Sequence, residues 1–171
     1  MTIILLLDKS GFVFWGLFAA IIHELGHLAA FALFGNKPRE ISAEISGIKI
    51  LKYNDNLNYI SEIIVLFAGA FVNFITFFLF NVTVQYQNFA YIHLILGIFN
   101  LLPIRTLDGG AIIHHILNRF ISFEKSINIC KILSIITTLP LIAGGIFLTI
   151  SARNFTLLIT GIYLFIKEIV D

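Results

Sequence analysis

Long hydrophobic runs separated by short polar stretches dominate the pattern of this chain. Two runs, residues 11–34 and 59–80, are long enough as helices to cross the roughly 30 Å hydrocarbon core of a bilayer. Three further apolar segments follow at residues 89–102, 132–150 and 155–166. The pattern therefore predicts about five transmembrane helices, of which the last is short.

The most polar stretch, residues 35–58, follows the first predicted helix. Ile41, Ala43 and Ile45 alternate there with polar residues, and Gly47 precedes a second short apolar segment. Period-two alternation around a glycine is typical of a β-hairpin, so we expect a short membrane-associated hairpin here. A surface loop with short strands is the alternative.

A second polar interruption, residues 100–110, lies inside an apolar region and contains Asn100, Pro103, Arg105 and Asp108. Irregular backbone at membrane depth is tolerated only where it is buried in protein or lines a cavity. This segment is therefore predicted to line a cavity that water can enter.

A helical pattern resumes at residues 111–120, and residues 122–131 are expected to form an amphipathic, interfacial link to the last two segments. No linker rich in Pro, Gly or Ser divides the chain, and no internal repeat is found. We therefore expect a single domain over residues 1–171. Its motif-bearing core covers about residues 1–120, and residues 121–171 form C-terminal helices.

The composition agrees with an all-α integral membrane protein. Of the 171 residues, 58% are hydrophobic and only 12% are charged, and the mean hydropathy is +0.97. A soluble domain of this size could not bury so much apolar surface, so lipid must be its main solvent. The net charge of +1 gives no reason to expect a nucleic-acid partner, and the single cysteine excludes an intrachain disulfide.

The distribution of basic residues predicts the orientation. Most Lys and Arg residues follow the first, third and fifth predicted helices, whereas the loop at residues 81–88 has none. Under the positive-inside rule, the ends of these three helices lie in the cytosol and the 81–88 loop lies outside.

The strongest chemical signal is the sequence from His23 to His27, which spells His-Glu-Leu-Gly-His inside the first apolar run. On a helix, histidines at i and i+4 project from one face and can bind one zinc ion, with Glu24 beside a metal-bound water. Ionisable residues at bilayer depth are costly unless they act together. The sequence therefore predicts a zinc site in the cytosolic half of the membrane.

A catalytic zinc ion usually has three protein ligands, so a third is needed. Asp108 is the leading candidate, because it is the only acidic residue between Glu62 and Glu124 and follows the third predicted helix at its cytosolic end. His114 and His115 are the next candidates, although histidines at an interface need no metal to explain them.

Asn73 lies in the middle of the second apolar run, directly after several small residues. An amide at this depth must find a hydrogen-bond partner. Two roles remain open for it: a hydrogen bond between helices, or contact with a substrate.

Three segments resemble, in order and spacing, the motifs of the site-two proteases: residues 23–27, 68–73 and 100–110. These proteins are intramembrane zinc metalloproteases and include small sporulation-type members. The similarity covers roughly residues 1–120. The chain has Ala70 and Thr106 where the family often has proline.

The resemblance implies a role for each matching residue. His23, His27 and Asp108 would bind zinc, and Glu24 would be the general base. Asn100, eight residues before the aspartate, would help to hold the substrate.

These observations predict a zinc-dependent intramembrane endopeptidase that cleaves transmembrane or membrane-associated proteins. Its expected surroundings are a bacterial cell membrane, a membrane-protein substrate and a regulatory membrane protein. A membrane zinc protease with a downstream Glu ligand is one rival, and the chain has no suitable glutamate after the second helix. The other rival is a non-catalytic metal-binding or transport protein, or an inactive scaffold, which would need the histidines but not Glu24.

Overall fold

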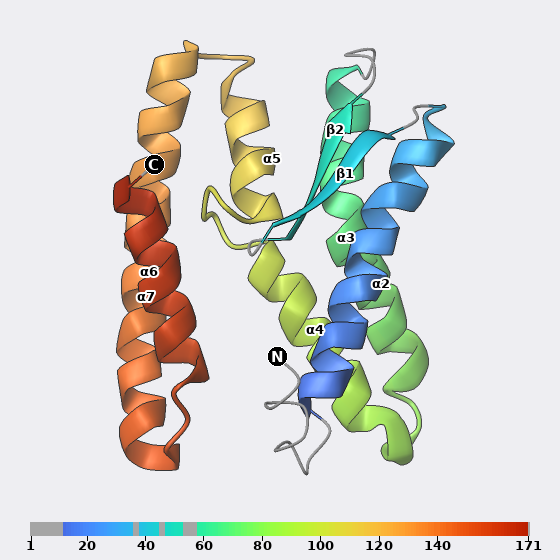
Figure 1. Ribbon diagram of the computed structural model, residues 1–171, viewed down its shortest axis with the longest axis vertical. Coiled ribbons are helices and arrows are strands. Elements are labelled where there is room, and N and C mark those ends of the chain that lie inside the picture. The colour runs from blue at the N-terminus through green and yellow to red at the C-terminus, as the bar shows by residue number, and fades with distance from the viewer. Residues whose placement is uncertain (1–11, 36–37, 45–46, 53–57, 171) are drawn as a thin grey trace. The chain divides into compact units, whose positions relative to one another are not determined.

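The structure of the protein is a computed structural model that describes residues 12–35, 38–44, 47–52 and 58–170, with only the backbone described in the strands. The chain divides into two compact units, Met1–Asn100 and Leu101–Asp171. Figure 1 shows both units, which are considered separately below.

Three helices build the first unit: α2 (Phe12–Leu33), α3 (Tyr59–Phe80) and α4 (Gln87–Asn100). A 3₁₀ turn, η1 (Val84–Tyr86), precedes α4. The predicted run at 59–80 matches α3, and the predicted run at 11–34 exceeds α2 by one residue at each end. The three helices pack against one another (Figure 1).

Between α2 and α3 lie two short strands, β1 (Pro38–Glu44) and β2 (Gly47–Lys52), which pair antiparallel. Ile41 is opposite Ile50, and the register is irregular between Pro38 and Glu40. The strands agree with the period-two pattern. Residues 45–46, where the predicted turn falls, lie outside the described residues, so the complete membrane-associated hairpin stays a prediction.

Three helices also build the second unit: α5 (Asp108–Leu117), α6 (Phe123–Ala152) and α7 (Thr156–Val170). Helix α6 packs along α7 and also contacts α5. A Cβ at Gly145 would lie 2.6 Å from the backbone of Leu158, so glycine is what lets α6 and α7 approach so closely.

The interfacial link predicted at residues 122–131 is part of α6. Ser122 is the N-cap, and residues 123–131 form the first turns of a helix that runs without interruption for 30 residues. The polar side chains in this stretch favoured a break in the pattern. Ser126 is nevertheless fully buried, and its Oγ lies 2.9 Å from His114 Nδ1 on α5, so it fits a continuous helix.

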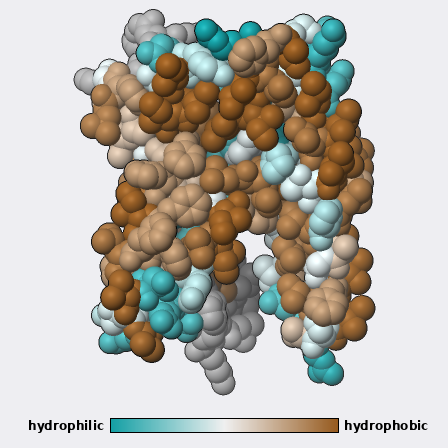
Figure 2. Space-filling model, turned by 180° about the vertical axis from the view of Figure 1, so that it is seen from behind, coloured by the Kyte–Doolittle hydropathy of each residue, from teal (hydrophilic) through white to brown (hydrophobic). Residues whose placement is uncertain are grey.

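Within the described residues, three helices are long and apolar enough to cross a membrane: α2, α3 and α6. Helices α4 and α7 have 14 and 15 residues, which is about 22 Å of helix and short of the hydrocarbon core. Hydrophobic residues cover most of the face seen in Figure 2. The protein is a multi-pass membrane protein, and a count of five spans remains a proposal.

The burial pattern is reversed relative to that of a soluble protein. Of the seven largest fully buried side chains in the described part, Ile104 alone is apolar. The other six are polar: His93, Glu168, Asn73, Thr138, Ser126 and Ser134. Because lipid solvates apolar side chains, the polar groups are the ones that need protein partners.

Candidate metal centre

Helix α2 brings His23 and His27 together on its buried face. Their Nε2 atoms lie 3.1 Å apart, and the rings meet edge to face with their centroids 4.8 Å apart. Only 4% of His23 and 8% of His27 is exposed. The predicted i, i+4 pair therefore forms one site, with both imidazoles shielded from solvent.

Glycines on α2 and α3 make the room for this pair. A Cβ at Gly69 would overlap His27 Nε2 and lie 2.7 Å from His23 Nε2, and a Cβ at Gly26 would lie 2.8 Å from the carbonyl oxygen of Ala68. The small residues of the 68–70 segment thus let α3 pass directly over the two imidazoles. A larger side chain at Gly69 would clash with the ring nitrogens of both histidines.

The other nitrogens of the two rings are held by α3. His27 Nδ1 donates to the carbonyl oxygen of Val65 at 2.7 Å, which leaves a lone pair on its Nε2. His23 Nδ1 lies 3.0 Å from Asn73 Nδ2, and Asn73 Oδ1 lies 2.8 Å from His93 Nδ1 on α4. Metal-binding histidines usually donate their second N–H to an acceptor, as His27 does here. The two histidines fit zinc in donor type and spacing.

Asn73 is fully buried, with its amide between His23 and His93. This is the hydrogen bond between helices that the sequence left open as one of two roles. The sequence also contained a signal for His93, because an ionisable residue in an apolar helix needs a polar partner. No role was assigned to His93 from the sequence alone.

Glu24 follows His23 on α2 and is half-buried. Asn100 is the last residue of α4, and its Nδ2 donates to the carbonyl oxygen of Leu96 at 3.1 Å. Both side chains remain partly accessible, which a proton acceptor and a substrate-binding amide require.

In the second unit, Asp108 is the first residue of α5 and is half-buried. The backbone of the preceding loop lies so close to the next two residues that only glycine fits there. A Cβ at Gly109 would overlap the carbonyl group of Leu101, and one at Gly110 would overlap that of Ile104. The loop therefore folds back onto the start of α5 and holds the aspartate at the helix end.

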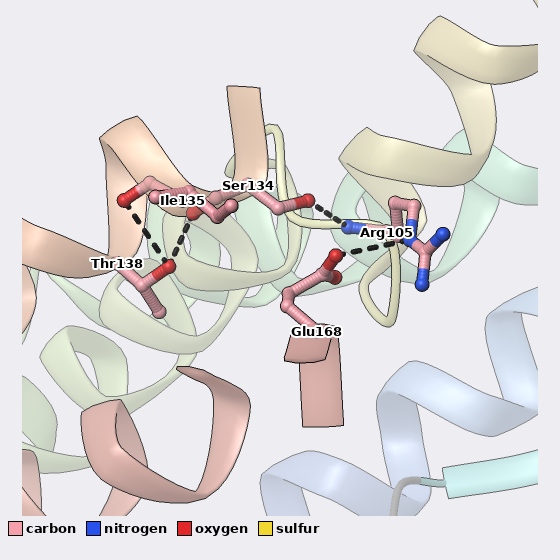
Figure 3. A network of polar contacts seen from close by, with 5 residues as sticks. All are labelled: Arg105, Ser134, Ile135, Thr138 and Glu168. Atoms are coloured by element: carbon pink, nitrogen blue, oxygen red, sulfur yellow. Dashed lines mark hydrogen bonds and ion pairs between the residues drawn. The ribbon is translucent and has the colours of Figure 1, made fainter. Parts of the chain in front are cut away.

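The same loop is tied to the C-terminal helices through Arg105 (Figure 3). Its backbone N–H donates to Ser134 Oγ on α6 at 2.8 Å, and its Nε lies 3.0 Å from Glu168 Oε2 on α7. The second contact is an ion pair without the alignment of a hydrogen bond. Glu168 is fully buried, whereas 21% of the Arg105 side chain is exposed.

The alternative ligand His114 has other partners. Its Nδ1 lies 2.9 Å from Ser126 Oγ, and its Nε2 lies 3.0 Å from Asn118 Nδ2. Burial lowers the pKa of His114, and the charges of His115 and Arg105 act in the same direction. These contacts account for His114 without a metal.

The chain is similar to known proteins in part of its sequence and in its fold. Residues 79–143 match the model of Peptidase family M50, a segment that includes α4, the Asp108 loop and α5. The structure also resembles that of the "Site-2 Protease from Methanocaldococcus jannaschii" with a TM-score of 0.72 and 20% sequence identity. That match covers 96% of this chain and 78% of the other, and it shows a shared fold. None of the curated protein sequences compared with the chain matches it.

Proposed function

We propose that this protein is an intramembrane zinc metalloendopeptidase of the M50, site-2 protease type, which cleaves a transmembrane or membrane-associated protein. The observation that carries the proposal is the buried pair of His23 and His27, with their Nε2 atoms 3.1 Å apart and Glu24 between them in sequence. The M50 match over residues 79–143 and the shared fold support it.

Asp108 is proposed as the third zinc ligand. Each of His23, His27 and Asp108 offers one ligand atom, either an imidazole nitrogen or a carboxylate oxygen. Two imidazoles and one carboxylate form a common ligand set for catalytic zinc and leave one position open. The fixed backbone around Gly109 and Gly110 supports this role, because a ligand must be held in place before the metal binds.

Zinc bound here would polarise the scissile carbonyl and lower the pKa of its bound water to about 7. The Glu24 carboxylate would accept the proton of the attacking water and pass it to the departing amine. Asn100 would donate its amide to the substrate backbone and so hold the peptide in register. The buried walls of the His23–His27 site would limit the entry of other water molecules.

A transmembrane substrate hides its carbonyl groups in helical hydrogen bonds, so it must unwind locally before cleavage. The strands β1 and β2 offer a way to hold the unwound segment, by pairing with it as an added strand. Substrate selection would then depend on how easily a helix unwinds and on a regulatory membrane partner.

The proposed setting is the cell membrane of a bacterium, with the site toward the cytosolic half and about five spanning segments. Membership of the small sporulation-type group belongs to the same proposal. The basic residues after the first, third and fifth helices support the orientation.

The test uses purified protein reconstituted with single-span substrate proteins, and cleavage and zinc content are measured in parallel. Glu24→Gln keeps the side-chain shape but cannot take a proton, so we expect normal zinc content and at least a 10²-fold loss of cleavage. Asn100→Ala should lower turnover and leave zinc unchanged. His23→Ala should lose both zinc and cleavage.

Cleavage by Glu24→Gln at the wild-type rate would overturn the protease mechanism. A zinc-binding protein in which no Glu24-dependent cleavage occurs would favour the non-catalytic alternative instead.

A further inference from the structure

His23 and His27, the two candidate zinc ligands on α2, differ in how their second nitrogens are held. His27 Nδ1 faces the carbonyl oxygen of Val65, which can only accept a hydrogen bond. His23 Nδ1 faces the amide of Asn73, which carries a donor on one side and an acceptor on the other. Asn73 and His93 are both fully buried, so no solvent competes for these groups.

With Asn73 Nδ2 toward His23, a chain of hydrogen bonds runs from His93 to Val65. The amide donates to His23 Nδ1, so the proton of that ring must lie on Nε2. That Nε2–H donates to His27 Nε2, 3.1 Å away, and the Nδ1–H of His93 donates to Asn73 Oδ1. In this arrangement His23 has no lone pair to offer a cation, and the two histidines bond to each other.

Metal binding requires the reverse arrangement. If His23 Nε2 binds a cation, its proton must lie on Nδ1 and needs an acceptor, which is Asn73 Oδ1 after the amide turns by about 180°. Asn73 Nδ2 then donates to His93 Nδ1, so the proton of His93 must lie on Nε2. In both arrangements each imidazole carries one proton. In His23 and in His93 that proton changes from one ring nitrogen to the other, so the total charge does not change.

The surroundings of His93 are compatible with both forms. Its Nε2 is buried and has no hydrogen-bond partner within the described residues, so neither a lone pair nor an N–H there disturbs another polar contact. The ring packs edge to face with Phe89, with the centroids 4.5 Å apart. An aromatic ring at this distance can weakly accept an N–H.

We propose that Asn73 is a positioning residue whose amide reverses when zinc binds, and that it couples the tautomer of His93 to metal occupancy at His23. The proposal rests on the zinc site of the proposed function. An amide at this position can form the hydrogen bonds of both arrangements, because it carries a donor and an acceptor. A carboxylate can only accept, so it fits the metal-bound arrangement alone, and an apolar side chain fits neither.

The direct test is ¹⁵N NMR of the imidazoles in the full-length protein, without metal and with one equivalent of zinc. The chain has 5 histidines, and His93→Gln identifies the signals of His93 by their loss. We expect the proton of His93 to move from Nδ1 to Nε2 when zinc binds. In Asn73→Asp the carboxylate accepts from both rings, so His93 should keep its proton on Nδ1 in both states.

Zinc affinity gives a second readout that is independent of cleavage. Asn73→Leu should weaken zinc binding about 10–100-fold, as is typical when the partner of a metal-binding histidine is removed. Asn73→Asp should bind zinc at least as tightly as the wild type. The matched control is Thr76→Val, because Thr76 is also buried on α3 but its hydroxyl donates to Val72 of its own helix.

An unchanged His93 tautomer in the zinc-loaded wild type would overturn the coupling and leave the proposed protease intact. If Asn73→Leu does not fold, the NMR comparison of the wild type with Asn73→Asp still tests whether zinc binding changes the tautomer of His93. A wild-type protein that binds no zinc would overturn both the coupling and the proposed function.

Discussion

The two units hold their candidate metal ligands by different physical means. In the first unit, His23 and His27 are oriented by hydrogen bonds with uncharged groups of α3, and glycines let the helices approach closely. In the second unit, the Asp108 loop folds back onto the start of α5 and is tied to α7 by the ion pair of Arg105 with the buried Glu168. The histidine pair should therefore be sensitive to added volume, and the aspartate loop to the loss of a charge.

The largest expected effect is that of added volume at Gly69. The Cβ of Gly69→Val would clash with the Nε2 atoms of both histidines, and overpacking of this kind typically costs about 1–3 kcal/mol even where side chains can move. We expect zinc affinity to fall by about 100-fold or more, measured by titration in detergent. Gly16→Val on α2 is the control, because a Cβ at Gly16 meets nothing within 4 Å. Equal zinc affinity of Gly69→Val and the wild type would show that the helix contact does not shape the site.

The next effect concerns charge in the second unit. Glu168→Gln leaves Arg105 without its partner, and breaking a fully buried pair costs about 3–5 kcal/mol. Since Arg105 is partly exposed, we expect about 1–3 kcal/mol here, together with a loss of cleavage as the loop moves. Adding Arg105→Gln should restore much of the stability, measured by thermal unfolding in detergent.

The neighbouring Lys167→Gln is the control for this series, because Lys167 lies on the same helix α7. A double variant that is no more stable than Glu168→Gln would show that the ion pair is not what holds the loop.

The smallest effect is a dependence of stability on pH. Burial lowers the pKa of His114 in the folded protein from its usual 6.5, so the unfolded chain binds the proton more readily. Stability should be fully present above about pH 6.5 and should fall as the pH drops toward the lowered pKa. His114→Gln should flatten this part of the profile of unfolding temperature between pH 7 and pH 5. If His114→Gln has the same pH profile of unfolding temperature as the wild type, groups other than His114 cause the pH dependence.

Much of the fold followed from the sequence alone. The hydrophobic run at residues 59–80 predicted α3, because in lipid an apolar segment of this length must satisfy its backbone as a helix. The i, i+4 spacing of His23 and His27 predicted their convergence for the same local reason: a helix places these positions on one face. Local geometry was sufficient in both cases.

The partners of those residues depended on tertiary structure. Asn73 needed a hydrogen-bond partner, but only the packing of α2, α3 and α4 decided that the partners are His23 and His93. Likewise, nothing in the spacing of Arg105 and Glu168, 63 positions apart, indicates that the last helix contacts the loop before Asp108. Hydrophobic periodicity predicts which faces are buried, whereas the pairing of polar groups across helices depends on how closely the backbones approach, which the glycines permit but do not direct.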